Sequence, residues 1–140
     1  MDLLDTNVVS EVRKKGSGRC DRNVLRWEKS VSAADLYISA ITILEIELGV
    51  LRVMRRDATQ GRILHDWLHG QVIPAFDGRI LPLDTAVALR GASLHVPDPR
   101  SEHDAVIAAT ALVHGMSVVT RNVADFEGMG LKIVNPWNRG

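Results

Sequence analysis

The chain has 140 residues, with 17 Lys plus Arg and 17 Asp plus Glu, so its formal net charge is +0 with neutral histidines. This length predicts a single domain over residues 1–140, and zero net charge argues against a general cationic coat for nucleic acid, although it allows a local basic patch. No apolar run approaches the roughly 18 residues of a membrane helix, and the single cysteine excludes an internal disulfide, so we expect a cytoplasmic protein with no membrane segment.

Short apolar runs alternate with helical patterns along the chain. In chain order we expect a strand at 1–4, helices over 6–15 and 23–31, a strand at 36–39, helices over about 41–54 and around 63–68, a strand at 80–83, helices over 85–94 and 102–114, and strands at 117–120 and 132–134. In the helix over 41–54, Leu44, Leu48 and Leu51 recur at helical spacing, so we expect them to be buried. Alternation without tight hairpins predicts an α/β protein with a mostly parallel sheet covered on both faces.

Carboxylates follow several of the expected strands. They are Asp5, Glu45 one helical turn into the next helix, Asp104 in the first turn of the Ala-rich helix, and Asp125. Ligands of parallel α/β sheets bind at the carboxyl ends of the strands, where all four acids can meet. Clustered carboxylates repel one another unless a cation lies among them, and a hard divalent cation such as Mg²⁺ prefers oxygen ligands.

Each acid also has an ordinary structural interpretation. Asp5 can cap the first helix, and Glu45 can be a residue of the helix surface. Ser101 and Asp104 have the spacing of a capping box, and Asp125 can belong to a surface turn. These interpretations are compatible with function, because a helix start is also a good place to aim a carboxylate.

Four segments carry a resemblance to a known family: residues 3–11 (LLDTNVVSE), 39–49 (SAITILEIELG), 103–111 (HDAVIAATA) and 120–126 (TRNVADF). The ending Val134-Asn135-Pro136-Trp137 adds to them. With these motifs in order over nearly its whole length, the chain resembles the PIN-domain ribonucleases, and within them the VapC and FitB toxins of bacterial toxin–antitoxin pairs. The resemblance implies a PIN-like three-layer α/β/α fold.

The resemblance also implies a site and a reaction. The family's acidic catalytic set falls on Asp5, Glu45, Asp104 and Asp125, with the metal on Asp5, Asp104 and Asp125. The implied chemistry is cleavage of RNA that depends on Mg²⁺ or Mn²⁺. Residues that support the acids or contact substrate are Thr6, Asn7, Thr120, Arg121 and Asn122. Arg121 is a candidate phosphate contact, and the alternative is an ordinary solvated arginine.

Partners follow from the same resemblance. A cognate antitoxin is expected to bind across the groove, and DNA is contacted only indirectly, through the antitoxin. The family suggests a homodimer. We expect a partner on apolar surface of the first helices and of the helix over 41–54, unless those residues are ordinary core. The alternative function is a non-catalytic partner protein that binds operator DNA through the antitoxin.

Three other classes of site deserve comparison. The segment His65-Asp66-Trp67-Leu68-His69 imitates the zinc-protease pattern, but Asp replaces Glu and no third ligand segment is apparent. A phosphatase with Asp5 as nucleophile needs a second acid two positions later, where this chain has Asn7. A phospho-acceptor receiver domain fails similarly, because it needs an acidic pair after its first strand.

Overall fold

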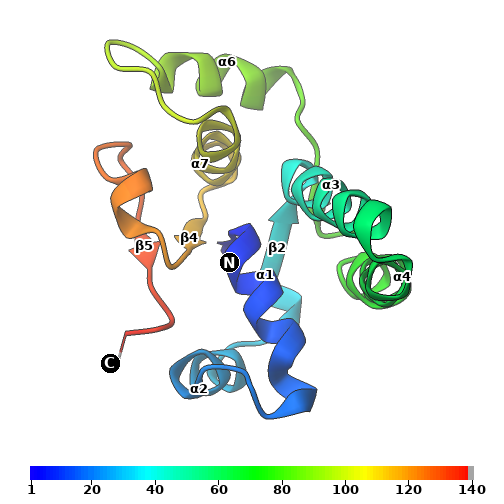
Figure 1. The fold of residues 1–140 in the computed structure, drawn as a ribbon. Coiled ribbons are helices and arrows are strands. Elements are labelled where there is room, and N and C mark those ends of the chain that lie inside the picture. The colour runs from blue at the N-terminus through cyan, green and yellow to red at the C-terminus, as the bar shows by residue number, and fades with distance from the viewer. Residues whose placement is uncertain (139–140) are drawn as a thin grey trace.

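The computed structural model describes residues 1–138 and is built around a five-stranded sheet in the order β3-β2-β1-β4-β5 (Figure 1). The strands are β1 (Asp2–Leu4), β2 (Leu36–Ser39), β3 (Ile80–Leu81), β4 (Ser117–Val119) and β5 (Ile133–Val134). All neighbouring strands are parallel. The predicted α/β class is confirmed, and β3, which ends just before Pro82, lies at an edge as a proline there favours.

The connections between strands are helical. The helices are α1 (Thr6–Val12), α2 (Arg22–Ser30), α3 (Ala40–Arg56), α4 (Ala58–Trp67), α5 (Ile73–Ala75), α6 (Thr85–Leu94) and α7 (Glu102–His114). The first helix is shorter than predicted because Arg13–Ser17 tightens into a 3₁₀ turn and Gly18 follows at φ 74°. A π-helical turn, Leu68–Val72, joins α4 to α5. None of the helices described within residues 1–138 has the length and apolar character needed to cross a membrane.

Polar side chains fix several helix starts. Asp84 accepts a hydrogen bond from the backbone N of Val87 at 3.0 Å, as expected for the cap of α6. Ser39 accepts from Ile41 N at 3.1 Å and begins α3 directly after β2. Each such bond satisfies an N–H group that has no partner inside the helix. The strand-to-helix junctions at the carboxyl ends are therefore short and well defined.

Two apolar clusters cover the two faces of the sheet. Leu4, in β1, belongs to the cluster with α1, α3 and the Leu68–Val72 turn, whereas its neighbour Leu3 belongs to the cluster with α7. Successive residues of a strand point to opposite faces, so this division follows from the strand itself. Helices therefore pack on both sides of the sheet, which gives the three layers α/β/α that the resemblance implied.

The predicted burial of the leucines in α3 is wrong. Leu44, Leu48 and Leu51 are 51%, 39% and 53% exposed. The buried residues of α3 are Thr42, Ile46 and Val50. The helix carries two apolar stripes with the same period, and the one that ends in Val50 faces the sheet. Periodicity alone cannot choose between two such stripes.

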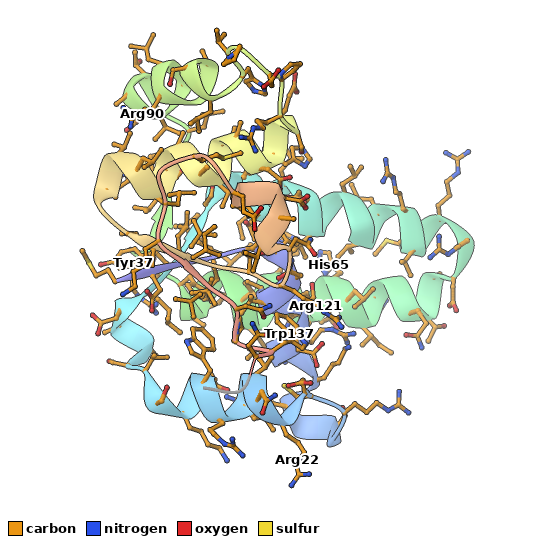
Figure 2. All side chains as sticks on the ribbon, turned by 90° about the vertical axis from the view of Figure 1, so that its left-hand side faces the viewer. Arg22, Tyr37, His65, Arg90, Arg121 and Trp137 are labelled. Carbon is orange, nitrogen blue, oxygen red and sulfur yellow. The ribbon has the colours of Figure 1, made fainter. Side chains whose placement is uncertain are left out.

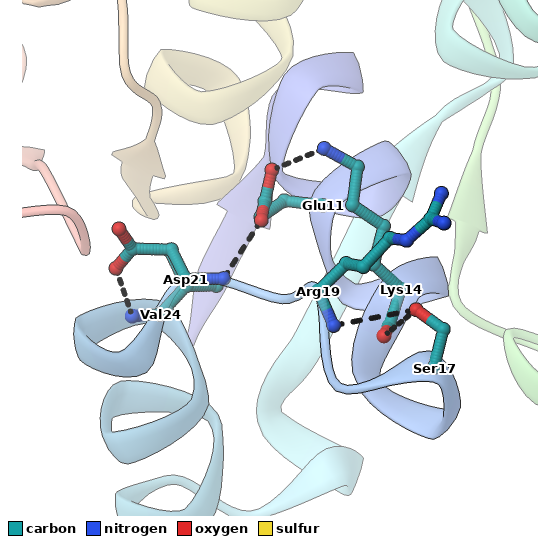
Figure 3. Close-up of polar contacts among 6 residues, drawn as sticks. All are labelled: Glu11, Lys14, Ser17, Arg19, Asp21 and Val24. Carbon is teal, nitrogen blue, oxygen red and sulfur yellow. Dashed lines mark hydrogen bonds and ion pairs between the residues drawn. The ribbon is translucent and has the colours of Figure 1, made fainter.

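A buried carboxylate organises the link between α1 and α2 (Figure 3). Glu11 accepts from Lys14 Nζ at 3.1 Å through Oε1 and from the backbone N of Asp21 at 2.8 Å through Oε2. Asp21 in turn caps α2 through Asn23 N and Val24 N. Burial raises the pKa of Glu11, but the hydrogen bonds from Asp21 and Lys14 outweigh it and hold the pKa below its ordinary value. Glu11 thus sets where α2 begins.

Candidate active site at the carboxyl edge of the sheet

Asp5 stands at the end of β1, with its backbone N bonded to Val119 O of β4 at 2.9 Å. Its side chain is buried and accepts from Thr6 N at 2.8 Å through Oδ1. The other oxygen, Oδ2, accepts from Thr120 Oγ1 at 2.7 Å and from Asn7 Nδ2 at 3.1 Å. A carboxylate has about four acceptor positions, so these three bonds orient Asp5 and leave room for about one further partner.

The pKa of Asp5 lies above its ordinary value. Burial is the largest cause, and the negative charge of Asp125 adds to it. The hydrogen bonds from Thr120, Thr6 and Asn7 favour the ionised form and offset part of the effect. Asp5 is therefore a rigid carboxylate in surroundings where a cation would lower its energy.

The polar residues around Asp5 support one another. Asn7 donates also to Thr120 Oγ1 at 3.4 Å, and its Oδ1 accepts from the backbone N of Arg121 at 3.2 Å. Thr120 Oγ1 accepts from the backbone N of Asn122 at 3.0 Å. The loop after β4 is thereby tied to the start of α1. The side chain of Asn122 makes no hydrogen bond within residues 1–138, so the structure gives it no contact that would hold Asp125.

Glu45 faces Asp5 from the first turns of α3. Its Oε1 accepts from Thr6 Oγ1 at 3.2 Å, and its Oε2 lies 3.6 Å from His103 Nδ1. The pKa of Glu45 lies above its ordinary value. Burial is the largest cause, the nearby His103 offsets part of it, and the charge of Asp5 raises the pKa further. Thr6 therefore links Asp5 and Glu45, with its backbone on one acid and its hydroxyl on the other. The helix-surface interpretation of Glu45 is wrong in this structure.

Asp104 is a half-buried carboxylate whose side chain accepts no hydrogen bond from any residue in 1–138. Burial, followed by the charges of Asp5, Asp125 and Glu45, raises its pKa to about 6, while His103 acts in the opposite direction. Ser101 begins α7 without a side-chain bond, so the capping box is not formed. The position of Asp104 is therefore unexplained by helix capping.

Asp125 is exposed on the 3₁₀ turn Val123–Phe126, which is anchored by the buried ring of Phe126. The surface-turn interpretation of Asp125 thus describes its local structure correctly. Its charge nevertheless acts on both Asp5 and Asp104, which places it beside the other acids. All four predicted acids lie at one edge of the sheet, and three of them have raised pKa values.

The donor set fits a hard divalent cation, because it consists of carboxylate oxygens whose charges oppose one another. Within residues 1–138, however, no three His, Cys, Asp or Glu side chains are close enough to hold a metal ion as they stand. Asp5 is fixed by its hydrogen bonds, whereas Asp104 has no such bond and Asp125 is exposed. Metal binding would therefore require the freer side chains to turn toward Asp5.

The zinc-like segment spans the end of α4 and the start of the Leu68–Val72 turn. The rings of His65 and His69 stack with centroids 4.2 Å apart, and His69 Nε2 lies 3.2 Å from Glu47 Oε2. Leu68, which lies between the two histidines in the sequence, is fully buried. The structure thus stacks the two histidines on each other, pairs His65 with Asp66 and His69 with Glu47, and leaves the acidic edge as the candidate site.

Two neighbours of the site were not predicted as site residues. His103 approaches Glu45, and the sequence signal for it is its position directly before Asp104. Trp137 lies beneath Arg121, whose guanidinium carbon is 5.2 Å from the indole centroid (Figure 2). Arg121 is exposed to solvent, as its alternative interpretation has it, and its guanidinium also lies over an aromatic ring.

Comparison with known proteins identifies the family of the chain. The family model described as "PIN domain" matches residues 3–129. The chain is 40% identical to a protein of Sinorhizobium fredii named VapC ribonuclease Y4jK, over 98% of each sequence, and 35% identical to Toxin FitB of Neisseria gonorrhoeae, over 99% of each. A solved structure described as FitAB bound to IR36 DNA fragment superposes with a TM-score of 0.88 at 34% identity, over 100% of this chain and 98% of that chain. This chain belongs to the PIN-domain family.

Proposed function

We propose that the chain is the ribonuclease toxin of a type II toxin–antitoxin pair and cleaves RNA phosphodiester bonds with a carboxylate-bound Mg²⁺ or Mn²⁺. The observation that carries this proposal is that four acids lie together at one edge of the sheet of a PIN-domain chain and that three of them have raised pKa values. Full-length similarity to a VapC ribonuclease and to a FitB toxin supports the substrate class and the toxin role. RNA as substrate in turn favours the cytoplasm as its place of action.

Each acid has a distinct part in the proposed reaction. Asp5, oriented by three donors, is the fixed ligand, and Asp104 and Asp125 are the ligands that adjust. When bound, the cation polarises the phosphate and lowers the pKa of a water molecule. Glu45, whose Oε2 lies 3.6 Å from His103 Nδ1, would accept the proton of the attacking water. A raised pKa suits this role, because a general base works best with a pKa near the working pH.

A cognate antitoxin is the proposed protein partner. A pocket of about 490 Å³ opens between α1, α2 and the α4–α5 segment, and its apolar lining includes Val9, Trp27, Trp67 and Phe76. This surface lies on the first helices, where the sequence predicted a partner. DNA would be reached only through the antitoxin, as the FitAB relative bound to a DNA fragment suggests. A partner of this kind is compatible with ribonuclease activity.

A second copy of the chain is the proposed occupant of the exposed α3 stripe. Leu44, Leu48 and Leu51 are all exposed, and Ile63 of the neighbouring α4 is 52% exposed. A stripe of leucines on one helix face is self-complementary, as a two-fold dimer requires. Burial of this stripe in a homodimer would remove apolar surface that the single chain leaves in water.

The proposal is tested by incubating the purified, antitoxin-free protein with a panel of RNAs, with Mg²⁺, with Mn²⁺ and with EDTA. We expect cleavage that requires the cation and is lost in Asp5→Asn, while the exposed Asp98→Asn control stays active. The same cations should raise the melting temperature of the wild type. Cleavage that survives EDTA, or that Asp5→Asn retains in full, would refute the assignment.

A further inference from the structure

The loop after β4 places a cationic and aromatic pair next to the acidic edge. The backbone N of Arg121 is bonded to Asn7 Oδ1, and Asn7 Nδ2 is bonded to Asp5 Oδ2. Arg121 is thus connected to the buried acid through one side chain. Its guanidinium extends over the ring of Trp137, and the two labelled side chains lie side by side in Figure 2.

Trp137 is held in position from several sides. Its backbone O accepts from Asn23 Nδ2 of α2 at 2.8 Å, and its backbone N donates to Asn135 Oδ1 at 3.0 Å. The half-buried side chain packs against the apolar cluster around Leu4 and Val8. The indole is therefore held in place beneath the guanidinium of Arg121.

The charge of Arg121 is not neutralised locally. Although it lies near several acids, Arg121 forms no ion pair with any residue in 1–138. An exposed guanidinium that lies over an indole offers a positive charge together with a flat surface. Unpaired RNA bases stack on aromatic rings and on arginine planes, and the adjacent phosphate is attracted by the charge.

The neighbouring surface has room for the sugar–phosphate chain. A pocket of about 430 Å³ runs between α2 and the C-terminal segment, and its lining includes the polar Asn23, Arg26, Ser30 and Asn135 together with the apolar Trp27 and Val134. Arg26, one of these lining residues, is an exposed cation. A strand that crosses the acidic edge and stacks on Arg121 could continue along these residues.

From these contacts we propose that the Arg121–Trp137 pair is a subsite that stacks an unpaired base of single-stranded RNA beside the acidic edge. The inference rests on the proposed ribonuclease function and defines its substrate as a strand with a free base next to the scissile phosphate. A base inside an A-form duplex is already stacked on its neighbours, so the subsite disfavours paired RNA. The charge of the pair favours a polyanion as its occupant rather than an apolar peptide.

The subsite is tested by binding, in an Asp5→Asn background that prevents cleavage. The probes are a fluorescein-labelled octa-adenylate RNA and an abasic octamer with the same sugar–phosphate backbone, compared by fluorescence anisotropy in Mg²⁺. We expect octa-adenylate to bind about 5- to 150-fold more tightly than the abasic probe, which is the effect of stacking one base. Trp137→Leu and Arg121→Lys should remove most of this ratio.

Charge and stacking can be separated by the choice of variant. Arg121→Lys keeps the positive charge and should preserve the salt dependence, whereas Arg121→Gln should reduce its slope by about 0.7. Trp137→Phe retains an aromatic ring and should keep much of the preference for octa-adenylate. Arg90→Gln on α6, which lies well away from Arg121 and Trp137 in Figure 2, is the matched control and should change neither quantity.

The outcomes distinguish this inference from the proposed function. If the wild type cleaves RNA but octa-adenylate and the abasic probe bind equally, the subsite is wrong and the ribonuclease function stands. If Trp137→Leu melts like its parent, keeps the octa-adenylate preference and loses antitoxin instead, the pair is a protein contact. If the wild type neither cleaves nor binds RNA, the proposed function fails and the subsite fails with it.

Discussion

Replacement of Asp104 by asparagine should stabilise the metal-free protein, because it removes a carboxylate whose ionised form destabilises the folded state. Asp104 is half-buried beside Asp5, Glu45 and Asp125, and its pKa is raised to about 6 from 3.8. The raised pKa means that the folded state disfavours the ionised form. Asn keeps the size and polarity of the side chain and removes its charge.

The magnitude follows from the pKa of Asp104. One unit of pKa corresponds to about 1.4 kcal/mol, so a fully shielded group would cost the folded state about 3 kcal/mol at neutral pH. Asp104 is only half-buried, and screening by solvent reduces this cost to about 1–2 kcal/mol. The cost is absent below pH 3.8, grows as pH rises toward 6 and is constant above it.

Urea denaturation followed by tryptophan fluorescence in EDTA measures the effect at pH 4 and pH 7.5. At pH 7.5 we expect Asp104→Asn to unfold with a free energy about 1–2 kcal/mol higher than that of the wild type, a rise in melting temperature of roughly 3–7 °C. At pH 4 the two proteins should be nearly equal. Asp98→Asn, which changes an exposed carboxylate, should follow the wild type at both pH values.

The same variant should respond weakly to metal. Millimolar Mg²⁺ or Mn²⁺ should stabilise the wild type at pH 7.5 and close the gap to Asp104→Asn, since a bound cation relieves the repulsion that the mutation removes. A variant no more stable than the wild type at pH 7.5, or a gain of equal size at pH 4, would refute the electrostatic reasoning.

Three further substitutions test the support of the site, the α1–α2 link and the proposed dimer. Thr120→Val removes the hydroxyl that donates to Asp5 Oδ2 at 2.7 Å, and should lower the free energy of unfolding in urea by about 1–3 kcal/mol. Thr120→Ser should retain most of the stability, and a Thr120→Val variant as stable as the wild type would contradict this reasoning. Because the pKa of Glu11 is lowered, the wild type should lose stability as pH falls below 4.5, and Glu11→Gln should flatten that decline; an unchanged pH profile would argue against it. Leu48→Glu should convert a dimer to monomer in sedimentation, whereas the control Leu89→Glu on α6 should leave the dimer intact. A persistent dimer of Leu48→Glu would exclude the α3 stripe as the interface.

The order of the strands and helices could be predicted because the local signals agree with the fold. Apolar runs such as Leu36–Ser39 match their strand fully, and caps such as Asp84 and the glycine at Gly115 fix the helix ends. Several strand ends differ from the prediction by one or two residues. Thr120, predicted as the end of a strand, instead turns its hydroxyl to Asp5.

Burial within a helix was harder to predict than the helix itself. In α3, Leu48 and Ile46 are both apolar and both belong to stripes of helical period, yet only Ile46 is buried. The choice depends on where the sheet and α4 lie, and α4 approaches α3 closely at Gly61, where a Cβ atom would lie 2.4 Å from Met54 Cα. The apolar period of α3 by itself does not show which of its faces the sheet and α4 will cover.

The acids of the site could be predicted from strand ends, but their partners could not. A carboxylate after a parallel strand has a defined place at the sheet edge, so Asp5 was predictable from topology alone. The contact of His103 with Glu45 and that of Trp137 with Arg121 join segments far apart in the chain. They depend on side-chain directions that only the assembled sheet determines.

Although the net charge is zero, a negative and a positive region lie next to each other at one edge of the sheet. The acids with raised pKa values oppose the approach of a phosphate, while Arg121 and Arg26 on the adjoining surface attract it. In the absence of a cation these effects oppose each other, and RNA should bind weakly. A divalent cation would remove the repulsion from the acids and leave the arginines unopposed. We therefore expect the affinity for single-stranded RNA to rise with Mg²⁺ in the wild type, although added salt alone should lower it.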